Sequence, residues 1–299
     1  MFIADTHSDT LFSLGVEGKQ DTMITADRLR DGGVTLQVFA LFTGSKGNKG
    51  DYEGIARAEM AQVPRLLEAG LRQVTNPADA KEGESCFMLS IEGCELFEKD
   101  VASVQAWYDR GVRMAALVWN NENRIGFPAK GGSREGLTPY GLEVVREMQR
   151  LGMAVDTSHL NEAGFYDLFN KTDKPPMASH SCCTALRSHF RNLTDDQLRL
   201  MIRNGSYVGV NFYPHFLTDT GRADLNDVAN HIDHICQLGG AGIVGFGSDF
   251  DGIECTPEGL EHPGHIPALL DALRARGYDE KTLRGVAGEN LLAYYSRIA

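Results

Sequence analysis

Histidine and carboxylate residues follow several apolar segments of the chain, at spacings that could build a metal site. His7 and Asp9 stand two residues apart after the first of these segments. In an extended backbone that spacing puts both side chains on one face, where an imidazole nitrogen and a carboxylate oxygen can share one ion. Further candidates follow other apolar segments: Glu92, His159, His180 and Asp249.

Three histidines and three carboxylates at one site would suit two divalent metal ions bridged by a carboxylate. Such a pair can hold one hydroxide and polarise a carbonyl or phosphoryl group. Imidazole and carboxylate ligands favour zinc, with manganese, cobalt or nickel as alternatives. The other histidines lie in predicted helices, in loops or near the C-terminus, and we interpret them as structural or solvated: His189, His215, His231, His234, His262 and His265.

These candidates need elements that bring them together, and the apolar pattern predicts alternating strands and helices. The strand candidates are nearly continuous in apolar character, which is typical of parallel strands covered on both faces. They span residues 2–6, 34–41, 86–91, 112–118, 154–156, 176–179, 206–210 and 243–247. Helical periodicity covers residues 52–73, 100–109, 140–151, 162–169, 195–203 and 225–238.

Eight strand–helix units in series predict a (β/α)8 barrel of the TIM type, forming a single domain over residues 1–299. Residues 257–299 are expected to add two or three closing helices. A doubly wound open sheet is the alternative, but no Gly-x-Gly-x-x-Gly motif follows the first strand. The candidate ligands fall at the carboxyl ends of predicted strands, where barrel active sites are built. Loops 42–52 and 120–136 are expected to form pocket walls.

Composition excludes several classes of function. The 29 Lys and Arg against 41 Asp and Glu give a formal charge of −12, which argues against a nucleic-acid-binding surface. No apolar run is long enough for a transmembrane helix. We also expect no signal peptide and a cytoplasmic location. The six cysteines are too sparse for a disulfide scaffold and are expected to be free thiols.

Short motifs that include the candidate ligands extend over nearly the whole chain. They are Asp5-Thr6-His7-Ser8-Asp9-Thr10, Ile91-Glu92-Gly93, Gly136-Leu137-Thr138-Pro139-Tyr140-Gly141, Asp156-Thr157-Ser158-His159, Ser179-His180-Ser181, Arg191-Asn192, Val210-Asn211-Phe212-Tyr213, Gly247-Ser248-Asp249-Phe250-Asp251-Gly252 and Gly288-Glu289-Asn290-Leu291-Leu292. In order and spacing they resemble the membrane (renal-type) dipeptidases, peptidase family M19, in the amidohydrolase superfamily.

The resemblance implies a role for each ligand candidate. His7 and Asp9 would hold one zinc, His159 and His180 the other, and Glu92 would bridge them. A hydroxide between the metals would attack the peptide carbonyl. Asp249 would act as the general acid and base.

The resemblance also implies that Arg191 grips the substrate's C-terminal carboxylate, for which a planar guanidinium is suited. Tyr213 and Asn120 are further candidates for substrate contact. One position departs from the family. Relatives carry a histidine in a Leu-Thr-His-Asn motif after the fourth strand, where this chain has Trp119 followed by Asn120. The indole N–H can donate a hydrogen bond but cannot become cationic, so the departure affects substrate range.

The sequence therefore predicts a binuclear zinc dipeptidase that hydrolyses small L,L- or L,D-dipeptides, with a homodimer implied by the family. An N-acyl amino acid hydrolase is the alternative on the same site. A metal-dependent nuclease or phosphoesterase is disfavoured because such enzymes usually open with His-x-His. A non-catalytic metal-binding protein would be expected to lack a ligand or the acid–base group.

Overall fold

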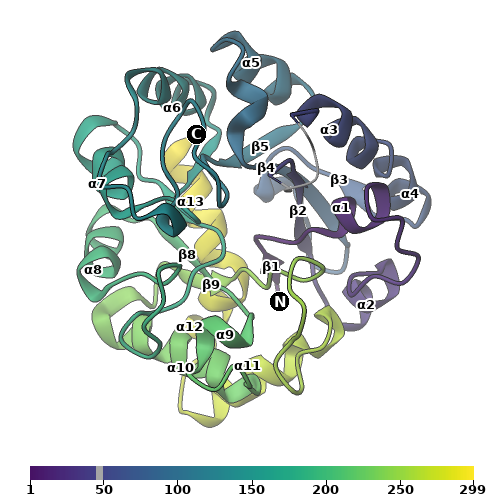
Figure 1. The fold of residues 1–299 in the computed structure, drawn as a ribbon. Coiled ribbons are helices and arrows are strands. Elements are labelled where there is room, and N and C mark those ends of the chain that lie inside the picture. Colours follow the sequence, from purple (N-terminus) through teal and green to yellow (C-terminus); the bar gives the residue numbers. More distant parts are fainter. Residues whose placement is uncertain (45–49) are drawn as a thin grey trace.

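Eight parallel strands form a closed barrel. The computed structural model describes residues 1–44 and 50–299. The barrel strands are β1 (Ala4–Asp5), β2 (Leu36–Phe42), β4 (Cys86–Glu92), β5 (Val112–Ala116), β6 (Ala154–Asp156), β7 (Met177–Ala178), β8 (Tyr207–Val210) and β9 (Val244–Phe246). Each strand pairs with its neighbours in this order, and β9 pairs with β1 to close the ring. All eight lie within or overlap the predicted segments, so the (β/α)8 prediction is confirmed (Figure 1).

Helices surround the strands, as Figure 1 shows. They are α1 (Thr10–Gly15), α2 (Ala26–Asp31), α3 (Tyr52–Met60), α4 (Val63–Glu68), α5 (Ala102–Asp109), α6 (Pro139–Leu151), α7 (Glu162–Lys171), α8 (Asp195–Asn204), α9 (Pro214–Leu217), α10 (Leu225–Ile235), α11 (Ile266–Ala275), α12 (Glu280–Arg284) and α13 (Asn290–Ile298). Caps fix the helix ends. At α8, for example, Thr194 and Gln197 form a capping box, and Gly205 ends the helix with φ 65°. The last three helices confirm the predicted closing segment.

The sequence prediction is wrong for residues 52–73, which do not form one helix. Two shorter helices, α3 and α4, replace it, and Arg72–Gln73 forms a short strand, β3, beside β4. Pro64 lies in the first turn of α4. A proline lacks the N–H that a continuous helix needs, which explains the break. The short helices α1, α2 and α9 were not predicted, because they span too few turns to show a helical period.

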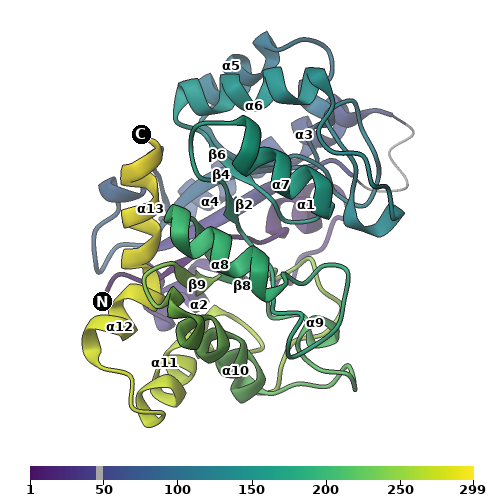
Figure 2. The same cartoon turned by 90° about the vertical axis from the view of Figure 1, so that its left-hand side faces the viewer.

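The interior of the barrel changes from apolar to polar along β4. Side chains of Cys86, Met88, Ser90 and Glu92 share one face of β4 because they alternate along it. Cys86 and Met88 belong to an apolar cluster that includes residues of α13. Glu92 lies at the opposite, carboxyl end. Figure 2 shows α13 and the N-terminus on one side of the barrel and α9 with long loops on the other.

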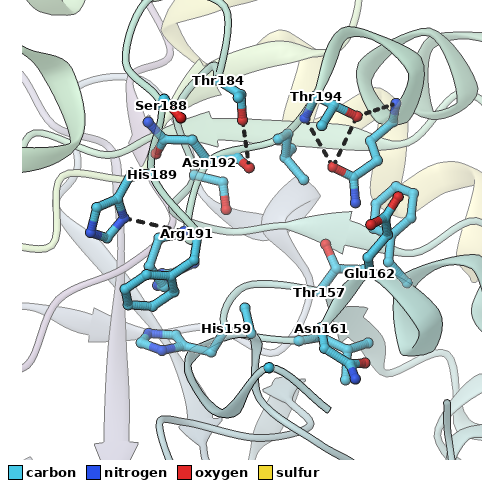
Figure 3. A pocket seen from close by; sticks show the side chains of 18 of the residues that line it. Thr157, His159, Asn161, Glu162, Thr184, Ser188, His189, Arg191, Asn192 and Thr194 are labelled. Carbon is cyan, nitrogen blue, oxygen red and sulfur yellow. Dashed lines mark hydrogen bonds between the residues drawn. The ribbon is translucent and has the colours of Figure 1, made fainter. Parts of the chain in front are cut away.

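Cavities open at the carboxyl end of the barrel. One of about 470 Å³ lies between residues that follow β6, including His159 and Asn161, and residues that follow β7, including His189 and Arg191 (Figure 3). A smaller cavity of about 180 Å³ is lined by Asp9, Glu92, Trp119, Asn120, His159, Arg191, Tyr213, Phe216, Asp249, Gly252, Ile253 and Glu254. Of the predicted wall loops, 120–136 contributes residues to both, and residues 45–49 of the other loop lie outside the described chain.

Among the described residues, no helix combines the length and apolar character that crossing a lipid bilayer requires.

Candidate metal centre

The predicted metal ligands come together at the carboxyl ends of the barrel strands. Glu92 is the last residue of β4, and His7 and His159 follow β1 and β6. His180 and Asp249 follow β7 and β9. The carboxyl ends of parallel barrel strands form one rim, and that is why residues so far apart in sequence meet.

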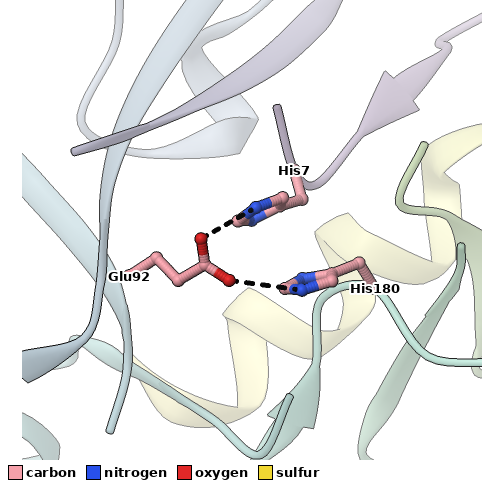
Figure 4. Close-up of side chains that lie close together, drawn as sticks. All are labelled: His7, Glu92 and His180. Atoms are coloured by element: carbon pink, nitrogen blue, oxygen red, sulfur yellow. Dashed lines mark ion pairs between the residues drawn. The ribbon is translucent and has the colours of Figure 1, made fainter. Parts of the chain in front are cut away.

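The Glu92 carboxylate lies between two groups of candidate ligands, with His7 on one side and His180 on the other (Figure 4). Its Oε2 is 3.6 Å from Nε2 of His7. Its Oε1 is 2.9 Å from Nε2 of His159 and 3.5 Å from Nε2 of His180. The carboxylate therefore presents a different oxygen to each group. This is the arrangement expected of a residue that bridges two cations.

One group, which we name the acidic side, consists of His7, Asp9 and Asp249. Nε2 of His7 is 3.9 Å from Oδ1 of Asp9 and 3.7 Å from Oδ1 of Asp249. Nε2 of His7 and Oδ1 of Asp9 are buried atoms without a hydrogen-bond partner in the described part of the chain. Buried polar atoms are usually paired. Two unpaired ligand atoms that face one another fit a bound cation, so these residues are suited to a metal.

The other group, which we name the histidine side, consists of His159 and His180. A second contact orients each ring. Nδ1 of His180 lies 2.7 Å from Oγ of Ser179, and that hydroxyl donates to Asp156. Nδ1 of His159 lies 3.3 Å from Oδ1 of Asn120. With Nδ1 as the protonated nitrogen, Nε2 of each ring keeps its lone pair toward Glu92. Contacts of this kind commonly fix the tautomer of metal-binding histidines.

Two similar aspartate–serine pairs join neighbouring strand ends beneath the centre. Asp156, at the end of β6, accepts hydrogen bonds from the backbone N–H and hydroxyl of Ser179 after β7. Asp5, at the end of β1, accepts the same two bonds from Ser248 after β9. Both aspartates are buried. The pairs hold the segments that carry His180 and Asp249.

The backbone is strained at two of the predicted functional residues. His159 and Asp249 have positive φ values of 70° and 66°. Residues other than glycine avoid this conformation, which occurs at sites where the surrounding structure enforces it. After Asp249 the chain also passes very close to the centre. A Cβ on Gly252 would lie 2.1 Å from Oδ2 of Asp9 and 2.6 Å from Oδ1 of Asp249, so a side chain cannot be accommodated there.

The charges of the acidic side are balanced by a proton in the metal-free protein. Burial alone would lower the pKa of His7, but the carboxylates of Glu92, Asp9 and Asp249 raise it to about 10. Burial and the charge of Glu92 raise the pKa of Asp9. Burial opposes ionisation of Glu92, yet the positive charge of His7 holds its pKa well below the usual range. A cation at this position would replace the proton on His7.

The histidine side is electrostatically different. Burial and the positive charge of Arg191 lower the pKa of His159 to about 4. Burial and the neighbouring His7 lower the pKa of His180. Both rings are therefore neutral at pH 7, in the form that binds a metal.

Asp249 is poised between its two protonation states. Burial raises its pKa, to about 6, with His7 opposing the shift and Glu92 adding to it. Asn211 donates a hydrogen bond from Nδ2 to its Oδ2 at 2.9 Å. A carboxyl group with a pKa near neutrality can both accept and donate a proton. Asn211 is a site residue that the sequence interpretation missed, although the motif Val210-Asn211-Phe212-Tyr213 contained it.

Arg191 lies on the histidine side and is available to an anion. Its side chain is buried, and Nη2 donates to the carbonyl oxygen of His180 at 3.2 Å. Nε has no hydrogen-bond partner, and no carboxylate lies within 4.0 Å of the guanidinium, among residues 1–44 and 50–299. A buried charge is costly unless it is paired. The guanidinium is therefore suited to a ligand carboxylate.

Trp119, Asn120 and Tyr213 all line the smaller cavity, together with Arg191. Trp119 packs edge-on against Phe42, with ring centroids 4.9 Å apart, and forms a wall. Asn120 also contacts His159, so it has an orienting contact that the sequence interpretation did not anticipate.

Two of the remaining histidines make structural contacts. His231 accepts a hydrogen bond from the backbone N–H of Cys183, and His234 pairs with Asp195. The cysteines are free thiols, as predicted.

Comparisons with known proteins agree with this arrangement. The family model for membrane dipeptidases (peptidase family M19) matches residues 1–298. A Klebsiella pneumoniae protein, described as an uncharacterized protein in the pqqA 5′ region, is 38% identical over 81% of this chain and 96% of its own length. An uncharacterized dipeptidase of Schizosaccharomyces pombe is 31% identical over 99% of this chain and 80% of its own length.

A solved structure is also similar over its full length. The metallopeptidase of Rhodobacter sphaeroides, liganded with a phosphinate mimic of the dipeptide L-Ala-D-Ala, superposes with a TM-score of 0.90. It is 27% identical in sequence, and the match covers 100% of this chain and 99% of that one.

Proposed function

The chain belongs to the membrane dipeptidase family, peptidase family M19, and is a peptide hydrolase; on that premise we propose that it is a binuclear metallo-dipeptidase. Its substrates are small L,L- or L,D-dipeptides, and the ions are zinc. His7 and Asp9 would hold one ion, His159 and His180 would hold the other, and Glu92 would bridge them.

The observation that carries the proposal is the position of the Glu92 carboxylate. One oxygen faces His7 at 3.6 Å and the other faces His159 and His180 at 2.9 and 3.5 Å. Zinc binds both imidazole nitrogen and carboxylate oxygen, so these donors suit it. The unpaired atoms of His7 and Asp9 support a cation on the acidic side.

When bound, the pair of ions would activate a water molecule and polarise the scissile carbonyl. Asp249 lies beside the ligands, with Oδ1 3.7 Å from Nε2 of His7. We assign to it the proton transfer that hydrolysis needs: it accepts the proton of the attacking water and delivers it to the departing amine. The hydrogen bond from Asn211 orients the carboxylate for both steps.

Substrate binding is assigned to the smaller cavity. Arg191 binds the C-terminal carboxylate of the substrate through its unpaired donors. The cavity has a volume of about 180 Å³, and we assign a small dipeptide to it. Trp119, Asn120 and Tyr213 contact the substrate from the walls. The dipeptide mimic bound to the Rhodobacter sphaeroides metallopeptidase supports this substrate class.

The proposal is tested by amine release from zinc-loaded protein with a panel of L,L-dipeptides, L,D-dipeptides and N-acyl amino acids. We expect turnover of dipeptides, and the panel ranks the two stereochemical series. Turnover of N-acyl amino acids alone would leave the metal centre in place but replace the substrate class. Two bound ions without turnover of any compound would contradict the assigned activity.

The cellular setting stays a prediction. We expect a cytoplasmic enzyme that forms a homodimer, and light scattering of the purified chain measures the second of these properties directly.

A further inference from the structure

One wall of the smaller cavity carries opposite charges at its two ends. The guanidinium carbon of Arg191 lies 5.6 Å from the ring centroid of Phe216. The Phe216 ring meets the Tyr213 ring edge-on at 4.9 Å. The Tyr213 hydroxyl in turn lies beside the Glu254 carboxylate, and burial together with that carboxylate raises the pKa of the tyrosine. The wall therefore begins with a cation and ends with an anion, and all four residues line the cavity.

Glu254 differs from the other carboxylates of this cavity because no basic side chain of the described residues lies beside it. Asp9, Glu92 and Asp249 lie within 3.9, 3.6 and 3.7 Å of Nε2 of His7. Within the described ranges, Glu254 has no lysine, arginine or histidine within 4.0 Å. Arg191 is the one guanidinium or ammonium group among the described residues that line the cavity. Among the residues that the structure describes, the site thus offers one cation and one anion without an ion-pair partner, beyond the residues assigned to metal and proton transfer.

The two charges enter the cavity from different segments of the chain. Arg191 follows β7 and donates to the carbonyl of His180. Glu254 follows β9 and comes two residues after Gly252, where a Cβ would lie 2.1 Å from Oδ2 of Asp9 and 2.6 Å from Oδ1 of Asp249. Asp9, Glu92 and Asp249 line the same cavity as Arg191 and Glu254, so a molecule bound at these carboxylates shares the cavity with both charges.

We propose that Glu254, with the Tyr213 hydroxyl beside it, binds the α-ammonium group of the substrate while Arg191 binds its α-carboxylate. The inference rests on the proposed dipeptidase function and deepens it. A zwitterionic dipeptide carries a cation and an anion on either side of the scissile amide, matching the wall. Charge-assisted hydrogen bonds to both ends would select a free amino terminus and reject N-acylated compounds.

The test compares free and N-acetylated Ala–Ala in three forms of the zinc-loaded enzyme, using the C-terminal configuration that the wild type hydrolyses faster. The forms are the wild type, Glu254→Gln and the control Glu258→Gln. Glu258 is an exposed residue of the same loop and does not line the cavity. Metal content and the thermal midpoint of unfolding are measured for each form.

We expect the wild type to prefer the free dipeptide by about tenfold or more in kcat/KM, the scale of one charge-assisted hydrogen bond. Glu254→Gln should lower kcat/KM for the free dipeptide by about tenfold, mainly by raising KM, because the contact is made in the ground state and the transition state alike. The acetylated substrate should be unaffected by the substitution. Glu258→Gln should keep the wild-type preference.

An unchanged preference in Glu254→Gln would overturn the inference, and so would an equal loss on both substrates, which indicates a structural effect. A Lys–Ala dipeptide separates the possible cations. If Glu254→Gln impairs hydrolysis of Lys–Ala but not of Ala–Ala, the carboxylate binds a side-chain cation and the α-ammonium assignment is wrong. A wild type that hydrolyses no free dipeptide would defeat the proposed function itself, whereas an active wild type with an unaltered preference in the variant defeats this inference alone.

Discussion

The acidic side and the histidine side share the Glu92 carboxylate, but their buried histidines differ in protonation. On the acidic side, three carboxylates surround His7, and the pKa of that ring is raised to about 10. On the histidine side, burial and Arg191 lower the pKa of His159 to about 4. In the metal-free protein, one side is therefore neutralised by a proton and the other by keeping its rings uncharged.

Because of this difference, we expect metal affinity to depend on charge on the acidic side and on ring orientation on the histidine side. The acidic side attracts a cation by charge, and its ligand atoms have no competing partners. The histidine side lacks that excess of negative charge, so its affinity depends more on ring orientation. Ser179 and Asn120 supply the orienting contacts. The comparison predicts that the two ions respond differently to substitution and to pH.

Replacing Glu92 should have the largest effect on metal affinity and turnover, because both sides share its carboxylate. In Glu92→Gln the bridging charge is lost while the shape is kept. We expect both ions to bind more weakly and kcat/KM to fall by about 10³-fold or more, since both ions take part in the reaction. Metal analysis after gel filtration, together with dipeptide turnover, measures the two losses. A variant that keeps two tightly bound ions would show that Glu92 does not bridge.

Asp249→Asn tests whether this member of the acidic side acts in proton transfer and not chiefly in metal binding. The amide cannot accept the proton of water, and we expect kcat to fall by about 10²–10⁴-fold. Both ions should remain, because His7, Asp9 and Glu92 are intact. Loss of both ions from this variant would contradict the assigned role and make Asp249 primarily a ligand.

Substitution of the orienting residues should have a smaller effect that is confined to one side. Ser179→Ala and Asn120→Ala remove the contacts at Nδ1 of His180 and His159. Metal affinity on the histidine side should fall by about 10- to 100-fold, the usual cost of losing such a contact. Titration with a competing chelator should then show one weakened ion and one unchanged ion. Equal weakening of both ions would indicate a general disturbance of the rim.

The sequence located the candidate ligands at one rim but not the residues that contact them. Parallel strands in a barrel end at one rim, and each candidate ligand lies at or shortly after the end of a strand: His7, Asp9, Glu92, His159, His180 and Asp249. Asp5 and Asp156 end strands too, but their side chains bond to serines on neighbouring strands. Which polar residue faces the cavity and which bonds beneath it depends on strand register, and the spacing of residues does not reveal register.

The predicted fold class is confirmed, but the prediction of one helix was wrong. Residues 52–73 have a helical period throughout, and that period masks the break at Pro64. Glu254 was missed for a different reason. It follows the motif that ends at Gly252, and its place in the cavity results from the close approach of the loop to Asp9 and Asp249. The close approach of the loop is a tertiary feature, and its one trace in the sequence is Gly252.

The smallest effect that we expect is proton release when a metal binds, and it measures the difference between the two sides most directly. At pH 7, His7 in the metal-free protein is protonated because its pKa is about 10, and a metal can bind Nε2 only after that proton leaves. His159, with a pKa of about 4, has no proton to lose. Loading the acidic side should therefore release about one proton or more, and its affinity should fall as pH decreases; loading the histidine side should release none.

Calorimetric titration of the metal-free protein with zinc, repeated in buffers of different ionisation enthalpy, counts the protons released with each ion. His7→Asn is the matched control, because it removes the titrating ring and should remove its proton from the count. The stability of the folded metal-free protein should change with pH in the opposite direction to metal affinity. A raised histidine pKa stabilises the folded metal-free protein below pH 6.5, and this contribution is lost as pH rises toward 10. The thermal midpoint of the metal-free wild type should thus decrease over this range more than that of His7→Asn. Equal proton release from both ions would contradict the contrast, because it would mean that the carboxylates around His7 do not hold a proton there.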